Sequence, residues 1–108
     1  MRRAMSCSAL VVLLQIASTH VGIAGEVVQV KISDLAFSPA EITVNAGDTV
    51  EWVNNDFIDH TATATGGDWD VMIAAGQSAR RQLTKTGTIK YFCRVHPDMT
   101  GTIHVVSK

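Results

Sequence analysis

Short apolar runs that repeat every second residue constrain the fold of this chain more than any other feature. Val28, Val30 and Ile32 alternate with polar residues, and the segment 49–53 alternates in the same way after a turn. This period is typical of β-strands with one buried face, and no segment shows a convincing long amphipathic helix. Further strands are predicted over 42–44, 60–65, 79–83, 88–93 and 101–106. The segment 68–76 is expected to be irregular, with at most a single helical turn.

The number and spacing of these runs predict the fold class. Seven to eight short strands separated by turn residues, in a chain of 108 residues, indicate an all-β sandwich of two sheets with Greek-key connections. Alternation places Tyr91 and Cys93 on the inner face of one predicted strand. In the last strand it places Ile103 and Val105 inward and His104 outward.

The N-terminal segment has the order of a targeting signal. Arg2 and Arg3 precede an apolar run over 8–17, and small residues follow. We therefore predict a secretory signal over 1–25, which implies export to the periplasm. The apolar run is too short to cross a bilayer, which disfavours an anchor that stays uncut. The remaining segment, 26–108, has the length of one domain with one core and no membrane attachment.

Charge and size exclude some classes of function. The chain has 9 basic and 10 acidic residues, and removal of Arg2 and Arg3 with the signal leaves 7 against 10, a net charge of −3. Such a domain lacks the basic surface that nucleic-acid binding requires. The domain is also too small to suggest substrate catalysis, so we do not expect an enzyme. We expect the protein to be a monomer.

The second half of the domain holds potential metal ligands at regular spacing. Two residues separate Cys93 from His96 and two separate His96 from Met99, and Pro97 restricts the loop that carries them. Cys7 leaves with the signal, so Cys93 has no partner for an intramolecular disulfide. A lone thiol in an oxidising compartment is a liability unless it is buried or bound to metal.

A fourth ligand must come from elsewhere in the chain. His60 is the obvious donor, because His20 leaves with the signal and His104 is expected to face solvent. One thiolate, two imidazoles and one weakly bound thioether form the ligand set of a type 1 (blue) copper site. The predicted ligands of one copper ion are therefore His60, Cys93, His96 and Met99.

These residues also allow other interpretations. Cys93 alone could be a buried apolar thiol, and Met72 is a rival axial donor whose apolar neighbours favour core packing instead. Structural zinc sites do not call for methionine, and nothing beside Cys93 and His96 resembles the orienting residue of a cysteine hydrolase. Four carboxylates form either an acidic recognition patch or ordinary solvated surface: Asp56, Asp59, Asp68 and Asp70.

Two segments of the domain resemble a known family. The run 37–54, from Phe-Ser-Pro-Ala-Glu-Ile-Thr-Val to Glu-Trp-Val-Asn, resembles the first half of a cupredoxin, and 87–101 resembles the second. The two-residue gaps on each side of His96 are similar to those of the amicyanins in this family. The resemblance implies a cupredoxin β-sandwich with a single type 1 copper at the four residues named above. It also implies that electrons pass through His96, at an apolar surface patch.

Two positions differ from the amicyanin pattern. Amicyanins usually have asparagine after the first histidine ligand, where its side chain ties the two ligand segments together, and Thr61 stands there in this chain. Thr61 keeps a hydrogen-bonding group but has a shorter reach. A proline commonly precedes the loop histidine, and Val95 occupies that position.

The predicted function is that of a periplasmic one-electron carrier. By resemblance to the amicyanins, its partners would be a donor dehydrogenase, such as methylamine dehydrogenase, and an acceptor such as a cytochrome c. The alternative is a periplasmic copper-binding or copper-delivery protein in metal homeostasis. Exposed sites rich in thioethers would favour delivery, whereas the processed chain keeps only Met72 and Met99.

Overall fold

The computed structural model describes residues 25–108. The predicted secretory signal therefore lies, except for its last residue, outside the described residues. The described part contains nine strands and no helix, and hence no helix long and apolar enough to cross a membrane. The strands are β1 (Val27–Ser33), β2 (Ala36–Ser38), β3 (Glu41–Asn45), β4 (Thr49–Asn54), β5 (His60–Ala64), β6 (Asp70–Ile73), β7 (Ser78–Gln82), β8 (Gly87–Phe92) and β9 (Thr100–Val106).

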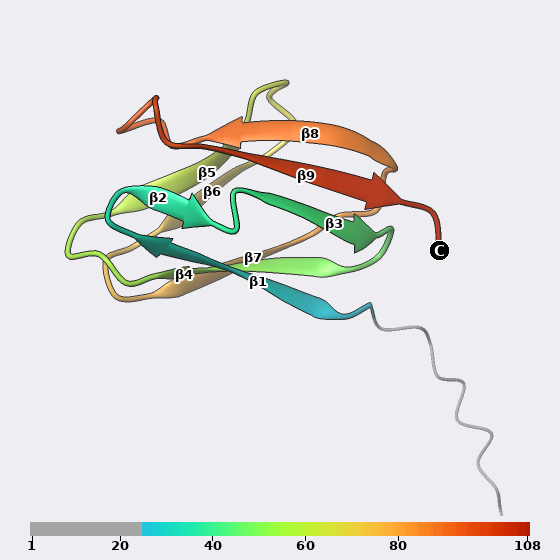
Figure 1. Cartoon of the computed structure of the whole chain (residues 1–108), viewed down its shortest axis with the longest axis horizontal. Helices are drawn as coiled ribbons and strands as arrows, with labels where there is room; N and C mark the ends of the chain where they lie inside the picture. The colour runs from blue at the N-terminus through green and yellow to red at the C-terminus, as the bar shows by residue number, and fades with distance from the viewer. Residues whose placement is uncertain (1–24) are drawn as a thin grey trace, which may run out of the picture.

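Two mixed sheets form the sandwich (Figure 1). One has the strand order β2-β1-β4-β7, and the other has the order β3-β9-β8-β5-β6. The pairs β1–β4 and β3–β9 are parallel, and the other pairs are antiparallel. The consecutive strands β3 and β4 are joined by a tight turn but belong to different sheets. The predicted all-β sandwich is thus confirmed.

Two strands were not expected from the sequence. β6 (Asp70–Ile73) lies within the segment predicted to be irregular, and that prediction was wrong. This strand pairs with β5 at the sheet edge, where only Ile73 is fully buried, so its apolar alternation is weak. β2 (Ala36–Ser38) has three residues and folds back on β1 through the turn at Asp34 and Leu35. These additions raise the strand count to nine, above the predicted seven to eight.

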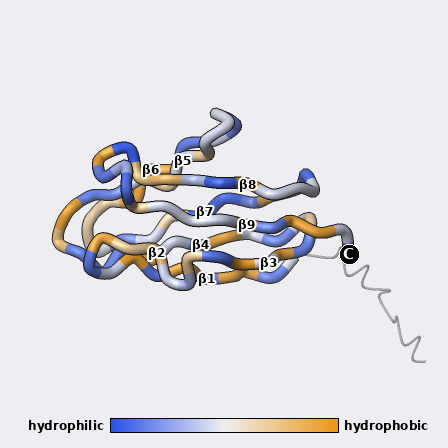
Figure 2. The backbone as a smooth tube through the Cα atoms, turned by 45° about the horizontal axis from the view of Figure 1, so that its top comes forward, coloured by the Kyte–Doolittle hydropathy of each residue, from blue (hydrophilic) through white to orange (hydrophobic). Residues whose placement is uncertain are grey.

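The core lies between the two sheets. Figure 2 shows hydrophobic and hydrophilic stretches following one another along the backbone of the sandwich. Trp52, Tyr91 and Trp69 pack together, with ring centroids 5.6 to 6.0 Å apart. The indole Nε1–H of Trp52 donates to the Tyr91 hydroxyl at 3.3 Å, which satisfies two polar groups inside the core. Burial raises the pKa of Tyr91 to about 12, so this hydroxyl keeps its proton and stays neutral.

One end of the sandwich gathers the segments that carry the predicted ligands. β4 ends at Asn54, β5 begins at His60, and Cys93 directly follows the end of β8. The loop 55–59 joins β4 to β5, and the loop 93–99 joins β8 to β9. Hydrogen bonds join the loop 55–59 to His60 and to the β1–β2 turn, and others join Thr61 on β5 to the start of the loop 93–99.

Gly101 provides a test of core packing. It faces Tyr91 in the β8–β9 ladder, and a Cβ added at this position would lie 2.3 Å from Cζ of the Tyr91 ring. We expect Gly101→Ala to lower the free energy of unfolding by about 1–3 kcal/mol, because the ring must move within a packed core. Gly66→Ala is the control, since a Cβ there meets no atom within 4 Å, and urea unfolding compares the two. Equal stability of both variants would contradict this account of the core.

Candidate metal centre

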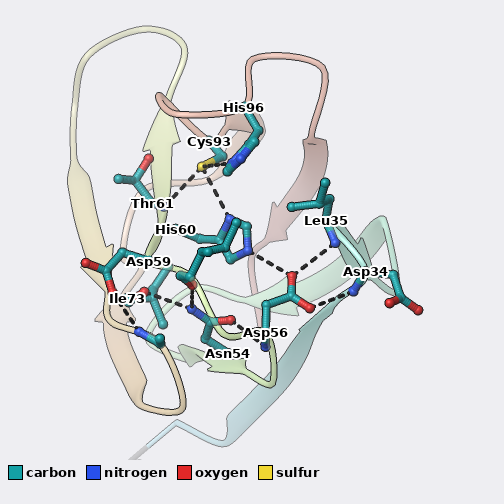
Figure 3. A network of polar contacts seen from close by, with 12 residues as sticks. Asp34, Leu35, Asn54, Asp56, Asp59, His60, Thr61, Ile73, Cys93 and His96 are labelled. Atoms are coloured by element: carbon teal, nitrogen blue, oxygen red, sulfur yellow. Dashed lines mark hydrogen bonds and ion pairs between the residues drawn. The ribbon is translucent and has the colours of Figure 1, made fainter.

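Three of the four predicted ligands meet at the end of the sandwich (Figure 3). One nitrogen each of His60 and His96 and the Sγ atom of Cys93 all lie within 4.8 Å of one another. The Cys93 Sγ atom is 3.7 Å from Nδ1 of His60 and 3.9 Å from Nδ1 of His96. Residues more than thirty positions apart in the sequence thus present their donor atoms to one point.

Met99, the fourth predicted ligand, ends the same loop. The Cys93 N–H donates to the Met99 carbonyl at 3.0 Å, and the Met99 N–H donates to the His96 carbonyl at 2.8 Å. These bonds close the loop on itself, and the Met99 side chain is buried. His96 and Met99 also line the same shallow pocket. The assignment of the thioether as an axial ligand stays a prediction.

The donor atoms fit a transition-metal ion. Bonds of about 2.0 Å to nitrogen and about 2.3 Å to sulfur, in a near-tetrahedral site, place such donors roughly 3.5–4 Å apart. The two sulfur–nitrogen distances fall in this range. His60 and Cys93 are completely buried, whereas His96 is half-buried. Of the three donor residues, only His96 is therefore partly accessible to solvent.

The metal-free site already favours the thiolate form of Cys93. Burial raises the pKa of the thiol, but hydrogen bonds from the Thr61 amide, His96, His60 and the Val95 amide outweigh it and lower the pKa from 9.0 to about 6. The Thr61 N–H donates to Sγ at 3.3 Å. Because a thiolate is the form that binds metal, the fold prepares this ligand before the ion arrives.

Asp56 fixes the orientation of the His60 ring. Its Oδ2 atom lies 2.9 Å from Nε2 of His60. Because Nε2 donates to this carboxylate, Nδ1 is the nitrogen that remains available to a metal, on the side of Cys93. Carboxylate–histidine pairs of this kind set the tautomer and basicity of a metal ligand. Asp56 is thus a functional residue that sequence reasoning did not assign to the site.

The same carboxylate holds the β1–β2 turn. Asp34 and Leu35 have positive φ values of 52° and 61°, which is uncommon for residues other than glycine. Both of their N–H groups donate to Asp56, at 2.8 and 3.0 Å. The Leu35 amide, ahead of His60 and the Asp34 amide, lowers the pKa of Asp56 despite the opposing effect of burial. Asp56 therefore stays ionised and compensates for the strain of the turn.

Asn54 and Asp59 shape the loop that carries Asp56. The buried Asn54 amide donates to the carbonyls of Ile58 and Ile73, and its Oδ1 atom accepts the Asp56 N–H at 2.9 Å. Asp59 accepts the Ala75 N–H at 2.9 Å. These contacts tie the loop to β6 and to the segment after it. The sequence signal that could have identified Asn54 is an asparagine at the end of a predicted strand, directly before an acidic loop.

Thr61 connects the two ligand segments although it replaces asparagine. Besides the bond from its amide to Cys93, its Oγ1 atom accepts the Arg94 N–H at 2.8 Å. Thr61 is completely buried. The threonine hydroxyl thus bonds the backbone of the residue directly after Cys93.

The structure corrects the expectation for Met72, shows what three of the acidic residues do, and confirms the orientation of His104. Met72 is 57% exposed on β6, so its predicted role in core packing was wrong. The reason is that β6 is an edge strand and Met72 faces solvent. Asp56, Asp59 and Asp70 accept defined hydrogen bonds and are not merely solvated. His104 faces outward as predicted and contacts Glu41 and Thr88.

Sequence comparisons relate this chain to known copper proteins. The sequence matches the family model of the cupredoxin-like domain over residues 6–105. It is 35% identical to a plastocyanin of Scenedesmus fuscus, over 66% of this chain and 87% of that protein. It is 30% identical to an amicyanin of Paracoccus versutus, over 74% of this chain and 65% of that protein.

Solved structures with a similar fold include an amicyanin and part of a copper enzyme. The crystal structure of amicyanin from Paracoccus versutus has a TM-score of 0.65 and 32% identity, and the match covers 73% of this chain and 80% of that one. A copper-containing nitrite reductase from Thermus scotoductus has a TM-score of 0.66 and 28% identity. The latter match covers 75% of this chain but 22% of the reductase, so it is confined to one part of that enzyme.

The depressed pKa of Cys93 predicts how stability depends on pH. Between pH 6 and 9 the unfolded chain keeps the thiol proton that the folded, metal-free protein releases. The free energy of unfolding should therefore rise as pH increases through this window and be lost as pH falls toward 6. Urea unfolding of the chelator-treated protein measures this slope, and Cys93→Ser should remove it. An unchanged slope in Cys93→Ser would show that other groups cause the dependence.

Proposed function

We propose that this chain, which belongs to the cupredoxin-like family, is a type 1 copper protein that carries single electrons between redox partners. The observation that carries the proposal is the convergence of His60, Cys93 and His96 on one point at the end of the sandwich. Amicyanins have been solved in Cu(I) forms and share this fold with the chain. Thiolate and imidazole donors suit both oxidation states of copper.

The proposed ligands of one copper ion are His60, Cys93, His96 and Met99. The first three would supply the imidazole and thiolate donors, and the buried Met99 at the end of the loop would supply a weaker thioether donor. When bound, copper supplies the exchange of one electron between Cu(II) and Cu(I). A zinc site is disfavoured because structural zinc is bound by cysteine and histidine, which would leave Met99 without a role as a ligand.

Hydrogen bonds within the protein, and not only bonds to an ion, fix the positions of the proposed ligands. Asp56 fixes the His60 ring, Thr61 holds both the Cys93 sulfur and the Arg94 amide, and the loop bonds close the segment 93–99. A site held in this way changes little in geometry between two oxidation states. Small rearrangement is what an electron carrier requires, since each rearrangement adds to the barrier for transfer.

His96 is the proposed route for electrons. It is half-buried, whereas His60 is fully buried. It lines a mostly apolar pocket with Leu35, Val95, Pro97 and Met99, in which Asp98 is the charged residue. Val95 is 58% exposed, so the valine at this position adds to the apolar surface. We propose a donor dehydrogenase and an acceptor such as a cytochrome c as partners that dock here. The chain is proposed to act as a carrier and not as an enzyme.

The proposed location is the periplasm, reached through the signal over 1–25. The order of charged, apolar and small residues in this segment supports the assignment. A copper site with an unpaired cysteine is compatible with an oxidising compartment, because bound metal protects the thiolate. The functional domain would then be the segment 26–108.

Copper binding is the direct test of the function. We expect Cu(II) added to the mature domain to give an intense visible absorption band from thiolate-to-copper charge transfer. Cys93→Ser should abolish the band, because the serine oxygen cannot supply the thiolate donor. His104→Ala is the control, since His104 faces outward beside Glu41. A colourless copper complex of the wild type would refute the proposal. Copper passed to an acceptor protein without redox turnover would favour delivery.

Export provides a separate prediction. Expression of the whole chain in a Gram-negative host should yield a periplasmic protein whose mass corresponds to a start near residue 25 or 26. Leu13→Arg should block export, because a charge in the apolar run prevents recognition of the signal. Intact mass spectrometry of the periplasmic fraction makes the measurement. Cytoplasmic accumulation of the uncut wild-type chain would contradict the predicted signal.

A further inference from the structure

The ladder between β5 and β8 stops short of the metal centre. The two strands pair at Ala64–Tyr91 and Thr63–Phe92 and at no position nearer to the site in the described structure. Beyond this point β5 extends to His60, and the segment that follows β8 extends to Cys93 and Arg94. The ligand-bearing ends of the two segments therefore lack the backbone pairing that would otherwise hold them together.

A ring of hydrogen bonds spans this opening. The Arg94 N–H donates to Thr61 Oγ1 at 2.8 Å, and Thr61 Oγ1 lies 2.9 Å from Thr63 Oγ1. The Thr63 hydroxyl donates to Asp70 Oδ1 at 2.6 Å. The Arg94 Nε–H donates to the same Asp70 oxygen at 3.1 Å, which returns the ring to its first residue.

The direction of every bond in this ring is determined. Because the Thr63 proton goes to Asp70, the bond between the two threonines must be donated by Thr61. The Thr61 oxygen is then free to accept from the Arg94 amide. Hydrogen bonds that run in one direction polarise one another, so the carboxylate strengthens the bond at the far end. Hydrogen bonds from Thr63 and Arg94 lower the pKa of Asp70, so it stays ionised at neutral pH.

We propose that Thr63 and Asp70 are positioning residues of the metal centre, which hold the Cys93–Arg94 segment against β5 through Thr61. Neither residue contacts a ligand side chain in the described structure, so both act through others. The ring takes the place of the side-chain tie that an asparagine after His60 would make. Its importance for copper rests on the proposed function, but the ring itself is a property of the metal-free protein.

Exposure suggests that the effect concerns position more than global stability. The side chains of Asp70 and Arg94 are 50% and 47% exposed, and such surface pairs contribute little to the free energy of unfolding. Thr61 is completely buried, and its amide bonds Cys93 Sγ directly. Loss of the ring should therefore loosen the segment at Arg94 while the core stays folded.

Amide hydrogen exchange in the metal-free protein tests the ring. Thr63→Val keeps the shape of the side chain and removes the hydroxyl. It should raise the exchange rate of the Arg94 amide by about threefold to tenfold, the range expected when one modest hydrogen bond is weakened. Thr63→Ser, which restores a hydroxyl, should return the rate to that of the wild type. Unfolding in urea should be nearly the same for all three proteins.

A matched pair of variants separates the ring from a general effect of charge. Asp70→Ala removes the acid of the Arg94–Asp70 pair, and Glu51→Ala removes the acid of the Arg80–Glu51 pair in the other sheet. Only Asp70→Ala should accelerate exchange at Arg94. The proposal is overturned if Thr63→Val leaves exchange at Arg94 unchanged, or if Glu51→Ala accelerates it equally.

A second measurement uses the copper-loaded protein. Removal of copper by a chelator should be several times faster in Thr63→Val and Asp70→Ala than in the wild type, Thr63→Ser or Glu51→Ala. Unchanged release rates beside faster exchange at Arg94 would overturn the positioning role. If the wild type binds no copper, the proposed function fails instead, and the exchange data alone then decide whether the ring exists.

Discussion

The structure depends on how a buried sulfur anion is stabilised between two strands that have separated. A thiolate inside a protein is costly unless donors surround it. Here the Cys93 sulfur accepts the Thr61 N–H and faces the rings of His60 and His96. The amide of Thr61 is available because the β5–β8 ladder ends at Thr63–Phe92. The end of the ladder therefore frees the backbone donor that stabilises the sulfur of a proposed copper ligand.

Much of this arrangement could be predicted from the chain, because it rests on local patterns. Period-two alternation identified most strands and placed Tyr91, Ile103 and Val105 inside, where the structure has them. The regular spacing after Cys93 singled out the ligand loop. The distant His60 was found by elimination, and the structure brings it to the loop.

The remaining features depend on contacts across space. β6 was missed because an edge strand beside glycines has few buried residues to show its period. Asp56 and Asn54 were missed because their value lies in partners on other segments: the β1–β2 turn, Ile73 and His60. A carboxylate in a loop has the same sequence signature whether it is solvated or holds a ligand. Only the fold distinguishes these cases.

The two histidines of the centre differ in a way that suits the proposed function. His60 is fully buried, begins a strand and is bonded to a carboxylate that also holds a turn, so its position is set by the scaffold. His96 lies on a loop, is half-buried and borders an apolar pocket. One imidazole is thus fixed to the sandwich, and the other faces the surface at which docking of a partner is proposed. Because the scaffold holds His60 from the buried side, His96 can stand at the surface, where Leu35, Val95 and Pro97 make its surroundings mostly apolar.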